Sequence, residues 1–233
     1  MWYDIQSDKS FFRLIRPSFY AYQMYNHDNL KIEQFLAPSL TIQTKGQTEF
    51  TFSYYRTTEE YYQFNFNKNQ YYFNLSNKTF PWLFIDFDAI FGDGIYYNSI
   101  YYGIDPFLGS VQSITTSLQL KPTNQWTSEF SANNYKFSGK FNSTEYKVIQ
   151  DILRFKTNYQ FTRSLFLRLI LERNNYYNDL DANILLSYQP MPGTVLFLGY
   201  NDYFIKHNEN SNFLKYQRMS RGFFSKISYL FRF

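Results

Sequence analysis

The chain has 233 residues and no cysteine, so one all-β domain would accommodate it, and disulfides, thiolate zinc sites and cysteine nucleophiles are excluded. The net charge of +4 is spread along the chain, without the cluster of Lys and Arg typical of nucleic-acid binding. Aromatic residues make up 23% of the chain, but the mean hydropathy is −0.47 and no apolar run reaches the 20 or so residues of a transmembrane helix. This combination favours a transmembrane β-barrel, in which apolar and polar residues alternate.

The start of the chain, Met1 to Asp4, lacks the basic and apolar regions of a signal peptide. We therefore expect that a signal was removed or, as the preferred interpretation, that this is the C-terminal part of a longer chain. Strand-like alternation begins soon afterwards, with a long pair at 11–25 and 30–44 joined around 26–29.

Further strands are predicted along the rest of the chain, at about 47–56, 69–75, 83–91, 114–120, 125–138, 153–161, 164–172, 182–188, 194–205 and 222–233. The clearest is Leu153 to Phe161, where Leu153, Phe155 and Tyr159 alternate with charged or polar residues. The predicted fold class is all-β, an antiparallel up-and-down transmembrane β-barrel of roughly ten to twelve strands in one domain, 1–233.

The predicted connections are unequal in length. Short turns are expected at 121–124, 161–163 and 189–193, and long loops at 92–109, 138–146 and 207–221. Short turns on one side and long loops on the other match the two rims of an outer-membrane barrel.

The last strand, Gly222 to Phe233, ends on an aromatic residue and carries Ile227, Tyr229, Phe231 and Phe233 at alternate positions. It resembles the C-terminal signal by which the barrel-assembly machinery recognises its substrates. The final strand must close the barrel, because an open sheet edge in lipid leaves backbone groups without hydrogen-bond partners, and its aromatic residues suit the interfacial girdle.

Charged and polar residues within strands are the candidate site residues. They are predicted to face the lumen, because Lys or Arg facing lipid at mid-depth costs about 2–4 kcal/mol. The set is Asp86, Asp88, Arg154, Lys156, Asn158, Arg168, Glu172, Lys226 and Arg232. Structural pairing of these side chains is preferred to a transport path, since about ten strands leave little open lumen.

No catalytic motif or metal site is predicted. His27 and His207 lie in loop-like segments without ligands at suitable spacing. Asp86, Asp88 and Asp93 do not match the spacing of an EF-hand loop. We expect no cofactor and no enzymatic activity.

A resemblance to a bacterial envelope family rests on two stretches, which read LRFKTNYQFTRSLFLRLI from Leu153 and LLSYQPMPGTVLFLGYND from Leu185. With the aromatic ending, they resemble the C-terminal barrel of a family whose members carry an N-terminal domain similar to carbohydrate-binding module family 9. The resemblance covers roughly the last third of the chain and supplies no catalytic motif. The sugar-binding-like domain is not evident in this sequence, so no carbohydrate function is carried over.

These observations predict a non-enzymatic, porin-like barrel in the cell outer membrane of a Gram-negative bacterium. It would serve as membrane anchor or narrow conduit of a larger envelope protein. Its expected partners are outer-membrane lipid, the barrel-assembly machinery, and a missing N-terminal domain or other envelope subunits, but not nucleic acid. Two alternatives stay open: an outer-membrane enzyme with a site at the rim, and a soluble β-rich binding protein.

Deletion of Phe233 should impair insertion, because it removes the terminal aromatic side chain of the predicted assembly signal. The measurement is the fraction of heat-modifiable protein in outer membranes. A deletion variant that assembles as completely as the parent chain would refute the signal.

Overall fold

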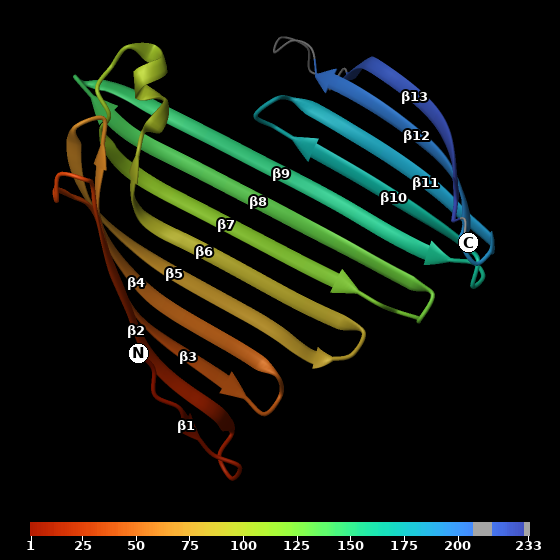
Figure 1. The fold of residues 1–233 in the computed structure, drawn as a ribbon, viewed down its shortest axis with the longest axis horizontal. Coiled ribbons are helices and arrows are strands. Elements are labelled where there is room, and N and C mark those ends of the chain that lie inside the picture. The colour runs from red at the N-terminus through yellow and green to blue at the C-terminus, as the bar shows by residue number, and fades with distance from the viewer. Residues whose placement is uncertain (207–215, 231–233) are drawn as a thin grey trace. The chain divides into compact units, whose positions relative to one another are not determined.

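The computed structural model describes residues 1–206 and 216–230. These residues form thirteen strands in a single sheet, and each strand pairs with its neighbours in sequence (Figure 1). The registers given for the strand pairs are all antiparallel. The predicted all-β, antiparallel, up-and-down fold is therefore confirmed.

The strands are β1 (Ile5–Gln6), β2 (Phe12–Tyr25), β3 (Lys31–Thr44), β4 (Thr48–Tyr61), β5 (Phe64–Phe80), β6 (Leu83–Ile95), β7 (Leu108–Leu120), β8 (Trp126–Phe141), β9 (Thr144–Gln160), β10 (Leu165–Asn174), β11 (Asp179–Met191), β12 (Thr194–Lys206) and β13 (Tyr216–Tyr229). One short 3-10 helix, η1 (Tyr97–Tyr102), lies between β6 and β7. The long strands β2 to β13 correspond to the twelve predicted segments. The count exceeds the prediction because the two-residue β1 adds a strand on the edge of β2.

The connections alternate between the two ends of the strands, because neighbouring strands are antiparallel. The end called here the turn end carries short connections, at 45–47, 81–82, 121–125, 161–164 and 192–193. The other, called the loop end, carries 26–30, 62–63, 96–107, 142–143 and 175–178. The long loop predicted at 92–109 is confirmed in its central part.

The long loop predicted at 138–146 is wrong. β8 and β9 run through it and meet at a two-residue turn, Asn142 and Ser143, with φ of 47° and 68°. Two consecutive left-handed residues are the signature of a tight hairpin turn, and Asn tolerates that conformation well. Of the loop predicted at 207–221, residues 216–221 belong to β13, and the remainder lies outside the described residues.

The sheet falls into two compact units, and each has one apolar and one polar face. Unit 1 comprises 1–79, 84–116 and 133–149. Its registers place Leu40, Phe52 and Phe73 in one row. The next row, on the opposite face, holds Thr41, Thr51 and Asn74.

Unit 2 comprises 80–83, 117–132 and 150–233. Its apolar face holds rows of apolar side chains such as Leu167, Leu186 and Leu198. Its polar face carries Arg168, which lies opposite Asn158 on β9. In both units, successive side chains point to opposite sides of the strand, as the pleat requires.

The apolar faces have no covering layer among the described residues, whose only non-strand element is η1. Large apolar side chains on these faces are accordingly exposed, for example Leu198 at 57% and Leu75 at 40%. A soluble sheet buries its apolar face against another layer. No helix in the described part of the chain is long and apolar enough to cross a membrane.

The face assignment makes a prediction for adjacent residues of β10. Replacing Leu167 or Leu169 with Arg should block assembly or destabilise the protein by about 2–4 kcal/mol, because the apolar face is predicted to contact hydrocarbon. Arg168→Gln, on the polar face, should be tolerated. Urea unfolding in vesicles measures both effects, and equal tolerance at the two kinds of position would show that the faces are assigned wrongly.

Candidate functional site

The polar face carries the predicted lumen-facing residues that the structure describes, and Asp86 and Asp88 lie on β6 in unit 1. Asp88 accepts hydrogen bonds from the hydroxyl of Tyr72 at 2.5 Å and from the side-chain amide of Asn74 at 3.1 Å. Asp86 shares this face, two residues away along the strand. The carboxylate of Asp88 is therefore bonded to the neighbouring strand β5.

The charged residues of β9 and β10 form pairs across strands in unit 2. Arg154 lies 3.7 Å from Glu172, and Lys156 lies 3.7 Å from Glu129 on β8. All four side chains are between 35% and 45% exposed, and pairs at this exposure contribute only about 0–1 kcal/mol. Two of the predicted cations thus neutralise carboxylates on adjacent strands.

The C-terminal residues divide between the two faces of β13. Lys226 lies opposite Phe197 on the polar face, whereas Ile227 lies opposite Leu196 and Tyr229 opposite Thr194 on the apolar face. The predicted residues Phe231, Arg232 and Phe233 lie outside the described residues.

A group of polar side chains near the loop end of unit 1 was not identified from the sequence. Glu59 on β4 forms an ion pair with Lys68 on β5 and accepts a hydrogen bond from the hydroxyl of Tyr97 in η1, at 3.1 Å. Burial raises the pKa of Tyr97 above its ordinary value, although the charge of Lys68 opposes the shift. The phenol therefore stays protonated and donates to Glu59, which attaches η1 to the sheet.

A cluster of aromatic side chains holds the 96–107 connection against unit 1. Tyr96 and Phe107, at the two ends of this connection, pack on Phe137 of β8 with ring centroids 5.3 Å and 6.2 Å away. Phe137 is only 2% exposed. Partly buried residues surround the cluster: Ile104, Tyr135, Phe141, Tyr146 and Val148.

The aromatic cluster lies on the polar face. The connection that Phe137 holds is bonded through Tyr97 to Glu59, which lies on the same side of β4 as Thr51 of the polar face. Glycine makes room for the cluster, because a Cβ on Gly109 would lie 2.5 Å from the Phe137 ring and 2.5 Å from the Ser138 carbonyl oxygen. The 96–107 connection therefore folds over the polar face instead of extending away from the strands.

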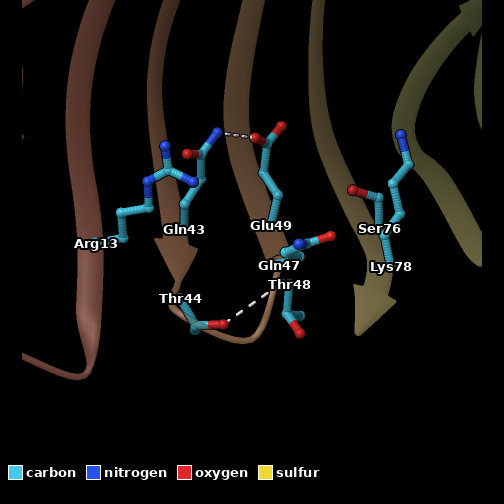
Figure 2. Close-up of a pocket in the computed structure, with 8 residues that line it drawn as sticks. All are labelled: Arg13, Gln43, Thr44, Gln47, Thr48, Glu49, Ser76 and Lys78. Atoms are coloured by element: carbon cyan, nitrogen blue, oxygen red, sulfur yellow. Dashed lines mark hydrogen bonds between the residues drawn. The ribbon is translucent and has the colours of Figure 1, made fainter. Parts of the chain in front are cut away.

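A polar hollow of about 280 Å³ lies at the turn end of unit 1 (Figure 2). Arg13 and Lys78 lie on either side of Glu49, which accepts a hydrogen bond from the side chain of Gln43 (Figure 2). The other lining residues are Thr44, Gln47, Thr48 and Ser76. The lining thus combines one carboxylate and two cations with amide and hydroxyl side chains.

The described residues contain no group of three or more His, Asp or Glu side chains that could hold a metal ion. The sequence matches no protein-family model and no curated protein, and the fold matches no solved structure.

Replacing Phe137 with Ala should release the 96–107 connection, because the ring joins both of its ends to β8. The loss of a buried Phe side chain costs about 3–5 kcal/mol, and we expect faster chymotrypsin cleavage between Tyr96 and Phe107. Phe130→Ala, on the exposed face of the same strand, is the matched control. Equal protection in both variants would show that the cluster does not hold the connection.

Proposed function

We propose that this chain is an outer-membrane β-barrel that anchors a larger envelope protein, with at most a narrow conduit through it. The observation that carries the proposal is a single layer of sheet whose apolar face has no cover among the described residues. In water such a face would have to be buried. In a bilayer the lipid covers it, and backbone hydrogen bonds between strands satisfy the peptide groups.

The side-chain order on the apolar face supports a membrane boundary within the strands. On β4 it runs Phe50, Phe52, Tyr54 and then Arg56, and Tyr54 packs on Tyr71 with ring centroids 5.5 Å apart. An aromatic row followed by a polar row is the pattern of an interfacial girdle. The row beyond it pairs Arg56 with Asn69, which suits a position outside the hydrocarbon.

Strand length supports the same boundary. β5 has 17 residues, whereas about 9–11 are enough for a tilted strand to cross a bilayer. The apolar rows occupy the part of the strands nearer the turn end, so the surplus length would project beyond the membrane at the loop end. In outer-membrane barrels the short turns face the periplasm, so in this proposal the loop end, which carries the long 96–107 connection, would face the cell exterior.

Closure into a barrel would pair β2 with β13 and give twelve long antiparallel strands, an even number as bacterial barrels favour. β1 now occupies that edge of β2: Ile5 pairs with Ile15 and Gln6 with Leu14. A barrel closed in this way requires the segment before β2 to leave the edge. Its displacement would break the β1–β2 pairing, the backbone hydrogen bonds of Tyr3 with Pro17 and Ser7 with Arg13, and the ion pair between Asp4 and Arg16.

An anchoring role is favoured over an open channel by the contacts of the polar face. The charged residues Arg154, Lys156 and Asp88 are bonded to adjacent strands, and the 96–107 connection lies over the same face. Membership of the envelope family with an N-terminal carbohydrate-binding-like domain is part of this proposal and rests on the sequence resemblance alone. In such a protein the barrel would hold the N-terminal domain in the periplasm, because β2 begins at the turn end.

Membrane fractionation and heat modifiability test the proposal together. The chain should be recovered in the detergent-soluble membrane fraction and should migrate faster in gels before boiling than after it, because a closed barrel resists detergent at room temperature. Recovery in the aqueous fraction without detergent would refute the barrel and favour a soluble β-rich binding protein. Conductance measurements on the folded protein in planar bilayers then distinguish an anchor from a conduit. We expect only brief, small increases in current.

A further inference from the structure

A bulge in β13 brings two arginines to the same face. In a regular strand Arg218 and Arg221, three residues apart, would point to opposite sides. The register shift between Tyr203 and Phe204 instead pairs Arg218 with Phe204 and Arg221 with Asp202. Bulges redirect side chains and are common beside functional sites. The bulge in β13 therefore indicates that the shared direction of the two arginines has a role.

Both arginines contact one carboxylate. Arg221 donates from Nε and Nη2 to the two oxygens of Asp202, at 3.2 Å and 3.4 Å, and Nε of Arg218 lies 3.0 Å from Oδ1 of Asp202. Asp202 is only 6% exposed. The arginine side chains remain 46% and 44% exposed, so they are accessible from outside the sheet.

Aromatic rings fix the two guanidiniums in place. Arg218 lies over the ring of Phe204, 5.3 Å from its centroid, and Arg221 lies over Tyr200 at 5.8 Å. Tyr200 also donates a hydrogen bond to Asp202. The arginines are therefore held close together and oriented before any ligand arrives.

This group lies on the apolar face, at the edge of the apolar rows. Along β12 the face runs Leu196, Leu198, Tyr200 and then Asp202. Tyr200 packs on Phe223 with ring centroids 4.7 Å apart. The order is the same as on β4 in unit 1: apolar rows, an aromatic row, and then charge toward the loop end.

Among the described residues the group carries an excess positive charge, because two guanidiniums share the carboxylate of Asp202. One arginine would suffice to neutralise Asp202. At the edge of the apolar rows, an anion at the same depth would stabilise the guanidinium that Asp202 does not need. Arginines in this geometry bind phosphate oxygens through several charge-assisted hydrogen bonds.

We propose that Arg218, Arg221 and Asp202 form a clamp for the phosphate of a lipid headgroup, bound on the outer side of the sheet where the apolar rows end. The acyl chains of this lipid would lie along Leu196, Leu198 and Ile227, and its phosphate would meet the two arginines. Asp202 is a positioning residue that keeps the guanidiniums together. The inference rests on the proposed membrane location of the chain.

The experiment uses the full chain folded into vesicles, followed by the fluorescence of its three tryptophans and by heat modifiability. Vesicles of phosphatidylcholine are compared with vesicles that also contain phosphatidic acid, whose headgroup is a phosphate alone. The test variant is R218Q/R221Q. The control is R168Q/K226Q, which removes the same charge from the polar face.

Phosphatidic acid should raise the folded-to-unfolded ratio of the parent chain and of the control. Replacing either clamp arginine should reduce this gain in the folded-to-unfolded ratio roughly five-fold, the effect expected of one basic residue close to an anionic membrane surface. The single variants R218Q and R221Q should show gains between those of the parent chain and the double variant. They keep the test valid if the double variant folds poorly.

A gain in R218Q/R221Q as large as in the control would overturn the clamp, since overall charge would then explain the preference. A gain of the same size from inorganic phosphate with phosphatidylcholine vesicles would overturn the lipid assignment. Failure of the parent chain to insert into any vesicle would instead refute the proposed membrane function, so the two failures are distinguishable.

Discussion

The alternation of side chains along a hydrogen-bonded strand is the constraint on which the rest of this structure depends. A shift of one residue in any strand pair would exchange the apolar and polar faces. The ladders from β9 to β12 avoid such a shift over their central rows, so that Leu167 meets Tyr159 on one side and Leu186 on the other. The two faces arise from this register, and both the membrane proposal and the pairing of charges follow from the faces.

Much of the fold could be predicted because alternation is a local signal. The order of residues from Leu153 to Phe161 already separates Phe155 and Tyr159 from Arg154 and Lys156, whatever the neighbouring strands are. The prediction failed at 138–146, where Gly139 and the polar residues around Asn142 read as a loop. The left-handed turn at Asn142 and Ser143 is visible only once the backbone conformation is known.

Contacts between strands could not be predicted in the same way, because they depend on register. Nothing local indicates that Lys156 would lie beside Glu129, or that Glu59 would meet both Lys68 and Tyr97. The aromatic cluster was missed for a related reason. In the sequence, Tyr96, Phe107 and Phe137 look like the many other aromatic residues of this chain. Only the fold shows that they meet on the polar face, where Gly109 leaves space for the ring.

The residues that break the alternation are therefore the most informative ones. On the apolar face, Asp202 follows Leu196, Leu198 and Tyr200. A carboxylate is unfavourable there without partners. The bulge in β13 supplies two arginines as partners where one would be enough. The bulge interrupts the regular ladder between β12 and β13, and its effect is to place a cation beyond what Asp202 needs. The side chains of Arg218 and Arg221 are 46% and 44% exposed, so an anion at the same depth could reach the surplus charge. The phosphate layer of a membrane is such an anion, so the departure from the pattern supports the same environment as the pattern itself.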